Sequence, residues 1–426
     1  MAVRASPIPA VAASESGRSR THRLAPLVAL YAALIVFGSL YPFTGWSEPT
    51  SPWFSFLTKP FPERFDRADM VTNVLAYAPL GLLTVVWLGG RRFHWSAVLV
   101  ATVAGTALSF SVETIQQTLP SRTSSNIDLL TNLFGTLLGA IAAGFVSHQT
   151  FAGRTFLNLR DTWVRKGNTP DLGLIVLALW ALAQTAPLVP SLDIANLRAG
   201  IAPLWQTFQA PETFNSAQMS TYALYILGLA MVARTLARPG KPMLLLFLAF
   251  VAGTLLFKIP VVSRELSLEA VAGAALAALA SLPLWLLKDR AAAWFGICMI
   301  VAGFVSAELA PGGDPVLRAF NWIPFLGQMS TLAGLTSILE NIWPFVALAY
   351  FGRCLTRGRS RTETVVLGSV GVAFLAFSLE WYQQYLPGRY GDITLLGLAL
   401  GGWLAPWWMG RGEPLATFDS ERRRHR

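Results

Sequence analysis

Long apolar runs recur along the whole of this chain, and no other feature restricts its fold as strongly. Of its 426 residues, 54% are hydrophobic and 13% are charged. A run of about 18 or more apolar residues forms a helix long enough to cross a hydrocarbon core about 30 Å thick. In lipid, the backbone polar groups must be paired internally, which an α-helix achieves. The sequence therefore predicts an all-α fold, a polytopic transmembrane helical bundle.

Hydropathy and helix length predict about twelve spans. They cover residues 24–43, 70–89, 97–117, 127–147, 171–190, 217–236, 243–262, 266–287, 291–310, 335–355, 364–386 and 393–410.

The loops between these spans differ in basic residues. Alternate loops are rich in them, such as the loops with Arg91 and Arg92 and with Lys288 and Arg290, whereas the opposite loops carry mostly single ones such as Arg122. Basic residues are favoured on the cytoplasmic side of a membrane. We therefore predict a multi-pass protein of the bacterial inner (plasma) membrane with both termini in the cytoplasm. Lys258, near the end of a span, is expected to extend toward the interface.

Several classes of protein are disfavoured by composition. There are two cysteines and four histidines, and the histidines lie in tails or short polar loops. We therefore expect no zinc site and no other metal, and we predict no cofactor. The net charge of +10 comes from basic residues that flank the spans. Basic residues are favoured at these positions by the positive-inside rule and by anionic lipid. Membrane lipid is the expected partner, and nucleic acid is not.

A polar motif interrupts the apolar chain twice. ETIQQTLPSR occupies residues 113–122 and EWYQQYLPGR occupies residues 380–389. Loop charges place both copies at the outer face. Ionisable groups in spans are costly and usually face a cavity or pathway. The candidate ligand-binding residues in the two copies are Glu113, Gln116, Gln117 and Arg122, and Glu380, Gln383 and Arg389.

The spacing in the first copy predicts one polar patch. Glu113, Gln116 and Gln117 have offsets of zero, three and four, so they share a face of a helix. Pro120 ends that helix, and the following turn is expected to bring Arg122 back toward the patch. An ion pair between Glu113 and Arg122 is the alternative interpretation, because both groups lie where they can also reach water.

The next span opens with a second polar stripe. Asp128, Asn132, Gly135 and Gly139 fall at offsets of zero, four, seven and eleven. The polar half is expected to complete the site, and the glycines permit close helix approach. Asn73, in the second span, is a further candidate for the same site.

Similar orders of features predict internal repetition. The first part of the chain has a span, then YPF at 41–43, then a pair of helices that carries the motif. The last part has the same order, with IPF at 323–325 and the second copy of the motif. Four spans per unit would make the repeats parallel. We predict a disordered cytoplasmic tail at 1–23, four-helix units at 24–147 and 291–410, a middle four-helix transmembrane unit at 148–290 that is a candidate degenerate repeat, and a basic cytoplasmic tail at 411–426.

The first unit resembles the VanZ-like family of bacterial membrane proteins. Units of that family carry a span with Asn and a downstream Pro-x-Gly, a Glu-x-x-Gln helix end, an Arg in a short loop, and an Asp and Asn opening the last span. The matching residues are Asn73, Pro79, Gly81, Glu113, Gln116, Pro120, Arg122, Asp128, Asn132, Gly135 and Gly139. The resemblance implies a cell-envelope protein and, through the founding member, a link to resistance against the glycopeptide teicoplanin.

The second unit matches the same pattern in part. Its matching residues are Glu380, Gln383, Pro387, Arg389 and Asp392. Asp392 is a further candidate ligand-binding residue. Continuing from Arg389 without a gap places Leu395 where the first unit has Asp128, and Ala399 where it has Asn132. The first unit is therefore the preferred site.

Three hypotheses for function follow. The first is a non-enzymatic protein that binds or handles an anionic envelope lipid or glycolipid, because an arginine fork suits phosphate and amides complete a hydrogen-bond shell. The second is a transporter of a small or lipid-linked substrate, which the scarcity of charges midway along the spans disfavours. The third is an enzyme acting on lipid-linked phosphate with Glu113 as base, although no nucleophile with an oriented base is evident. We name no catalytic residue.

Overall fold

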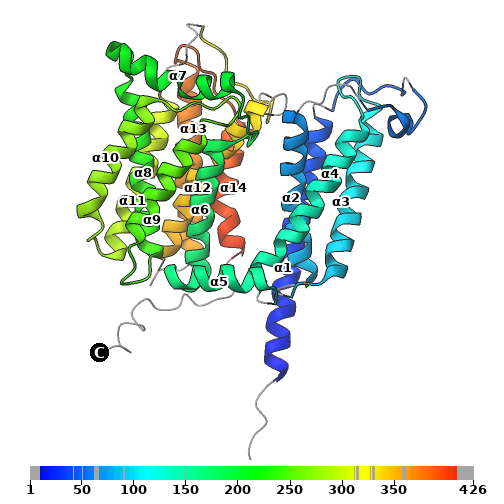
Figure 1. Ribbon diagram of the computed structural model, residues 1–426, viewed down its shortest axis with the longest axis horizontal. Helices are drawn as coiled ribbons and strands as arrows, with labels where there is room; N and C mark the ends of the chain where they lie inside the picture. Colours follow the sequence, from blue (N-terminus) through cyan, green and yellow to red (C-terminus); the bar gives the residue numbers. More distant parts are fainter. Residues whose placement is uncertain are drawn as a thin grey trace, which may run out of the picture. The chain divides into compact units, whose positions relative to one another are not determined.

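The computed structural model shows a protein built from α-helices joined by loops of different lengths (Figure 1). It describes residues 10–41, 43–49, 51–61, 67–89, 92–147, 149–310, 312, 316–326, 328, 332–356 and 361–409. Within these residues there are fourteen α-helices, three 3-10 helices and no β-strand. Twelve α-helices coincide with the predicted spans, so the predicted all-α bundle is confirmed.

The chain divides into two compact units, Met1–Arg160 and Asp161–Arg426, here called the N-terminal and C-terminal units. The helices of the N-terminal unit are α1 (Ala10–Leu40), η1 (Ser55–Thr58), α2 (Arg67–Gly89), α3 (Trp95–Gln116), α4 (Asn126–Ala142) and η2 (Ala143–Val146), and α5 (Phe151–Trp163) follows across the boundary.

The first helix differs from its predicted extent. α1 begins at Ala10, so it includes much of the segment 1–23 that the sequence predicts to be a disordered tail. Alanine and arginine in that segment favour helix, and the apolar span extends it without a break. Residues 1–9 and the predicted basic tail at 411–426 lie outside the described residues.

The packing of the N-terminal unit centres on α2 and α4, which form its most extensive helix contact. The small residues predicted to permit close approach lie in this interface. A Cβ atom at Gly135 would lie 2.5 Å from the carbonyl oxygen of Val74, and one at Gly139 would clash with the carbonyl of Ala78. Glycine therefore sets the distance between the two helices, as small residues do in membrane bundles.

The C-terminal unit contains two groups of four long helices. They are α6 (Asn168–Thr185), α8 (Ser216–Leu236), α9 (Met243–Phe257) and α10 (Leu268–Leu284), followed by α11 (Asp289–Glu308), α12 (Leu332–Leu355), α13 (Arg361–Gln383) and α14 (Thr394–Met409). The remaining elements are α7 (Ile194–Gln209) and η3 (Pro211–Thr213).

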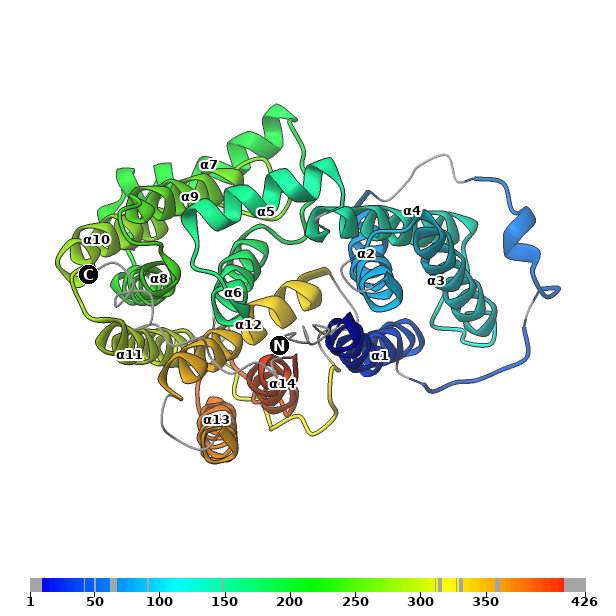
Figure 2. The ribbon, with the colours of Figure 1, turned by 90° about the horizontal axis from the view of Figure 1, so that it is seen from below.

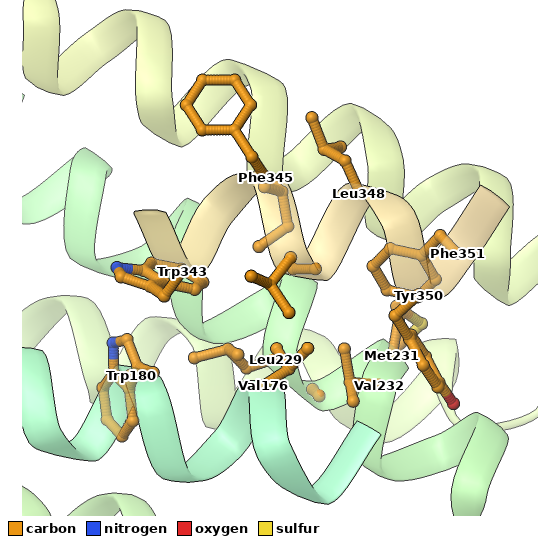
Figure 3. Close-up of a cluster of buried hydrophobic side chains, with 14 of the residues drawn as sticks. Val176, Trp180, Leu229, Met231, Val232, Trp343, Phe345, Leu348, Tyr350 and Phe351 are labelled. Atoms are coloured by element: carbon orange, nitrogen blue, oxygen red, sulfur yellow. The ribbon is translucent and has the colours of Figure 1, made fainter. Parts of the chain in front are cut away.

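These two groups share one hydrophobic core. Helix α6 packs against α8 and α12, and α11 packs against α8 (Figure 2). Figure 3 shows the side chains at the centre, which include Trp180 from α6, Leu229 and Met231 from α8, and Phe345 and Tyr350 from α12. None of these five is more than 1% exposed. The middle helices are therefore one packed body with the last four.

Two short helices, α5 and α7, were not predicted as spans, and both are amphipathic. On α7, Ile194, Ile201, Trp205 and Phe208 lie along one face and are exposed. Arg198 and the internal Pro203 interrupt the apolar sequence, so a hydropathy window does not detect this helix.

Length and composition identify a membrane protein. Six helical segments of the described residues are long and apolar enough to cross a membrane: Asp69–Gly89, Trp95–Gln116, Asn126–Val146, Ser216–Leu236, Asp289–Glu308 and Arg361–Gln383. Three shorter apolar helical segments are Leu24–Leu40, Met243–Phe257 and Leu268–Leu284. Many large apolar side chains on these helices are exposed, as a lipid-facing surface requires.

Candidate ligand-binding site

The N-terminal unit carries a group of polar side chains between α2, α3 and α4. We call it the polar cluster and define it as Asn73, Tyr77, Ser109, Glu113, Asp128 and Asn132. Four of these were predicted from the motif pattern. The two hydroxyl residues, Tyr77 and Ser109, were missed because a lone hydroxyl in an apolar helix gives no motif signal.

The partly exposed part of the cluster joins α2 to the first turn of α4. Asn73 Nδ2 donates to Asp128 Oδ1 over 2.8 Å. Asp128 also interacts electrostatically with Glu113 and with Asp69, at the start of α2. Asn73 and Asp128, both candidates from the sequence, are thus in direct contact. Three carboxyl groups therefore lie close enough to interact at this end of the bundle.

The deeper part of the cluster contains polar atoms without a well-formed hydrogen bond. Asn132 Nδ2 donates to Ser109 Oγ over 2.9 Å, but Asn132 Oδ1 has no hydrogen bond. The hydroxyl of Tyr77 interacts with Ser109 and Glu113, yet it forms no hydrogen bond of ordinary geometry. Tyr77 is 3% exposed and Asn132 is 5% exposed. Buried polar atoms nearly always have a well-formed hydrogen bond, so two that lack one mark a place for a bound group or water.

Glu113 has a structural contact as well as its place in the cluster. Its Oε2 accepts the backbone N–H of Ser125 over 2.9 Å, and its own carbonyl accepts the hydroxyl of Ser124 over 2.6 Å. Ser125 is the N-cap of α4, and its side chain accepts the N–H of Ile127. The Glu113 carboxylate thus fixes the turn between α3 and α4 and satisfies a backbone donor that the helix start leaves free.

Arg122 does not point to Glu113, and the two form no ion pair. Its Nε and Nη2 donate to the carbonyl of Tyr41 over 3.2 and 2.9 Å, and Nη2 also donates to Gly38 over 3.2 Å. These carbonyls close the C-terminal end of α1, where a cation is favoured by the helix dipole. Gln116 Nε2 donates to a third carbonyl there, that of Ser39, over 2.8 Å. The predicted single patch is therefore divided between two locations.

Gln117 is the remaining candidate in the first motif, and its side chain forms no hydrogen bond at either location. Both its amide nitrogen and its amide oxygen are buried without a partner. Its counterpart in the second motif, Gln384, instead donates to the carbonyl of Trp381.

The second motif makes the same helix-end contacts. Arg389 Nε donates to the carbonyl of Ala310 and its Nη2 to that of Ala307, each over 2.8 Å, at the end of α11. Gln383 Nε2 lies 3.3 Å from the carbonyl of Glu308 and 2.5 Å from its Oε2. The arginine thus uses the same two nitrogens on carbonyls three residues apart. We call this contact the arginine clamp.

The second carboxylate also repeats its contact. Glu380 Oε2 accepts the backbone N–H of Asp392 over 2.5 Å, and Asp392 Oδ1 accepts the N–H of Thr394 over 2.8 Å. Asp392 therefore occupies the position of Ser125, an N-terminal cap, and not the position of Asp128. Its place in the motif had suggested a ligand group, but the structure gives it a capping contact.

An arginine clamp occurs a third time, in the middle helices. Arg264 Nε donates to the carbonyl of Ala186 over 2.5 Å, and its Nη2 donates to Ala183 over 3.0 Å, at the end of α6. Two residues after the first acceptor, Leu188 has a φ of 58°, and Phe43 has a φ of 60° at the same place after α1. In the sequence, the sign of this similarity is that Ser263 and Arg264 repeat the pair Ser121 and Arg122 of the first motif.

The interior behind the second motif is apolar. Gly402 of α14 lies against the carbonyl of Ile342 in α12, and Gly135 of α4 lies against the carbonyl of Val74 in α2. These equivalent contacts align α12 with α2. In that alignment Phe345, Ala376, Leu395 and Ala399 stand where the polar cluster has Tyr77, Ser109, Asp128 and Asn132, and all four are at most 3% exposed. Asn341, which aligns with Asn73, donates to the hydroxyl of Ser337 in its own helix.

A separate set of charges in the C-terminal unit was not predicted as a group. Lys258 is 5% exposed, and its Nζ donates to the hydroxyl of Tyr222 over 3.2 Å, so the expectation that it extends to the interface was wrong. Glu340 pairs with Arg264 over 3.2 Å. Glu308 also interacts with Glu340. The opposite charges here compensate one another, which is the ordinary arrangement of ionisable groups in a bundle.

The chemistry available in the polar cluster is hydrogen bonding by carboxylates, amides and hydroxyls. Within the described part of the chain, no three His, Cys, Asp or Glu side chains are grouped so that they could hold a metal ion. The cluster also contains no serine or cysteine with an oriented base, so it has no arrangement for nucleophilic catalysis.

The fold and the cluster describe a helical membrane protein with a polar site in its N-terminal unit. Residues 3–147 match the family model described as VanZ/LLP1. This part of the chain is therefore VanZ-like, as the resemblance in sequence predicts, and the match does not extend to the second motif. No curated protein and no solved structure matches the chain.

Proposed function

We propose that this protein is a multi-pass protein of the bacterial inner membrane that binds an envelope lipid or glycolipid by its headgroup in the polar cluster. Both termini are cytoplasmic in this proposal, because the basic loops alternate as the positive-inside rule requires. The polar cluster then opens toward the outer face. The two buried polar atoms without a well-formed hydrogen bond, at Tyr77 and Asn132, are the observation that carries the proposal.

The charges of the cluster favour the donor groups of a headgroup. Glu113 and Asp128 supply carboxylate oxygens, and the guanidinium of the same motif, that of Arg122, is engaged on α1. A sugar hydroxyl or an amine provides the donors that such acceptors require. The sequence motif predicts that the arginine binds the headgroup. In this proposal the carboxylates and amides bind it instead.

An anionic lipid also needs a cation, and the loop before α2 offers one. Asn126 Nδ2 donates to the backbone carbonyl of Lys59 over 2.7 Å, which holds this loop beside the start of α4. The side chain of Lys59 is exposed. In the proposal its ammonium contacts the phosphate of the lipid while the rest of the headgroup enters the cluster.

Conservative variants of the cluster test this function. Tyr77→Phe and Asp128→Asn change single groups while retaining side-chain volume, and Asn341→Ala is the control in the apolar counterpart. Native mass spectrometry of the purified full chain would measure retention of lipids that share acyl chains and carry glycerol, ethanolamine or monosaccharide headgroups. We expect Asp128→Asn to lower retention about tenfold, the effect of one charge-assisted hydrogen bond, and Asn341→Ala to leave it unchanged.

Equal retention of all three lipids by the wild type, or unchanged retention by both cluster variants, would contradict the proposal. The alternative functions give different results in the same preparation. A transporter would move the retained lipid between the leaflets of reconstituted vesicles. An enzyme acting on lipid-linked phosphate would release a product in a manner that depends on Glu113.

The link to glycopeptide resistance is a further part of the proposal and rests on the VanZ-like N-terminal unit. We expect a strain producing the protein to tolerate more teicoplanin than one producing Asp128→Asn at equal level in the membrane. Equal minimal inhibitory concentrations would separate lipid binding from resistance.

A further inference from the structure

A cavity lies between helices of the C-terminal unit, apart from every residue assigned above. It has a volume of about 640 Å³ and is lined by residues of α11, α12, α13 and α14. That volume lies within the range of about 300–1,000 Å³ typical of small-molecule sites. Its walls are mostly apolar, and they include Trp294, Ile297, Leu348, Leu367, Leu375 and Trp403.

The position of α13 accounts for this cavity. Helix α13 lies at the edge of the C-terminal unit and packs mainly on α14 (Figure 2). In the N-terminal unit, the corresponding helix α3 packs on both α2 and α4. Two glycines lie on the side of α13 that lines the cavity. Gly368 lies against the ring of Trp403, whereas a Cβ at Gly371 would meet no atom within 4 Å.

Among the residues that the structure describes, Arg290 is the charged side chain that lines the cavity, and it is exposed. Neighbouring arginines are bound within the protein. Arg165 and Arg234 pair with Asp289 over 2.8 and 3.1 Å, and Arg353 donates to a backbone carbonyl of α14. Arg290 forms no hydrogen bond or ion pair with any residue that the structure describes. An unoccupied guanidinium beside an apolar groove is complementary to an anion that carries a hydrocarbon chain.

We infer that the groove between α11 and α13 binds an anionic phospholipid, with an acyl chain along the apolar wall and the phosphate on Arg290. Basic groups between membrane helices on the cytoplasmic side bind anionic lipid headgroups, and the loop charges assign Arg290 to that side. This site differs from the polar cluster in its structural unit and in its lining, which is an apolar wall with one arginine instead of carboxylates, amides and hydroxyls. The inference shares the membrane orientation of the proposed function but does not use its binding site.

Two variants separate the acyl chain from the phosphate. Gly371→Leu places a side chain in the groove. Its control is Gly253→Leu on α9, because a Cβ at Gly253 would also meet no atom within 4 Å and Gly253 lies outside the groove. Arg290→Gln removes the charge, and its control is Arg198→Gln on the exposed part of α7.

The measurement is native mass spectrometry of the purified full chain with phosphatidylglycerol and phosphatidylcholine of identical acyl chains. We expect the wild type to retain phosphatidylglycerol about fivefold more strongly, the effect of one basic residue near a lipid phosphate. Arg290→Gln should abolish this preference, and Gly371→Leu should reduce retention of both lipids. Both controls should match the wild type.

An unchanged preference in Arg290→Gln would overturn the inference, and so would unchanged retention in Gly371→Leu. Because Arg290 is exposed, its replacement tests the inference even if Gly371→Leu does not fold. Loss of retention in Asp128→Asn alone would concern only the polar cluster, so the two proposals fail independently.

Discussion

The α1–α4 bundle and the α11–α14 bundle share a framework but differ in their interior. Each has an arginine clamp on the end of its first helix and a glutamate that accepts the N–H of a capping residue before its last helix. Behind this framework, the first bundle has Tyr77, Ser109, Asp128 and Asn132. In the second bundle, the aligned positions are Phe345, Ala376, Leu395 and Ala399.

This difference separates architecture from the candidate site. Groups that make identical contacts in both bundles, such as Arg122 and Arg389, are explained by closing helix ends. Groups found in one bundle, such as Asp128 and Tyr77, are not needed for that framework. A buried hydroxyl without a well-formed hydrogen bond costs free energy, so its presence calls for a function that the apolar bundle lacks.

The largest effect is expected where both bundles bring helices close together. Valine at Gly135 or at Gly402 would place Cβ 2.5 Å from the carbonyl of Val74 or 2.8 Å from that of Ile342. A backbone carbonyl cannot move aside, so Gly135→Val and Gly402→Val should each cost more than the about 1–3 kcal/mol of ordinary overpacking. Thermal unfolding in detergent and yield would measure this.

Gly401→Val is the control for this prediction, because a Cβ at Gly401 meets no atom within 4 Å. If Gly402→Val were as stable as Gly401→Val, the two bundles would not share this close helix approach.

The arginine clamps should give the next largest effect. Arg122→Ala and Arg389→Ala each leave helix-end carbonyls without a donor, at about 1–3 kcal/mol for a buried group. We expect similar decreases in melting temperature for the two variants, and partial recovery with lysine, which keeps the charge but lacks the fork. A loss of lipid retention without loss of stability in Arg122→Ala would contradict the structural role of this arginine.

The smallest change in stability is expected from replacing the two glutamates by glutamine. An amide oxygen still accepts the N–H of Ser125 or Asp392, so Glu113→Gln and Glu380→Gln should each alter the free energy of unfolding by about 1 kcal/mol or less. Lipid retention should fall only in Glu113→Gln, because only Glu113 belongs to the polar cluster. Equal loss of retention in the two variants would show that the bundles do not differ in binding.

Much of the fold could be predicted because hydrophobic periodicity and length act locally. The span predicted at 217–236 is α8, Ser216–Leu236, and the span predicted at 335–355 is α12, Leu332–Leu355. Helix α7 was missed because Arg198 and Pro203 interrupt its apolar stripe. The helical extension of α1 before residue 24 was missed because it is polar and carries no span signal.

The candidate site could be predicted only in part. Asp128 and Asn132 were identified from the spacing of the motif and Asn73 from its place in the second span, and the structure brings Asn73 and Asp128 into contact. Arg122 was assigned to the wrong partner, because its acceptor, Tyr41, lies 81 positions earlier in the chain. Nothing in a single sequence reports which helix end a long side chain reaches.

The sequence by itself determined the approximate limits of the long apolar helices, the two copies of the motif and the loss of Asp128 and Asn132 from the second copy. These follow from residue type and local spacing. Only the tertiary structure decided which polar groups are engaged. It paired Arg122 with α1, left the Tyr77 hydroxyl without a well-formed hydrogen bond and opened the groove beside α13, because such contacts depend on how distant helices pack against one another.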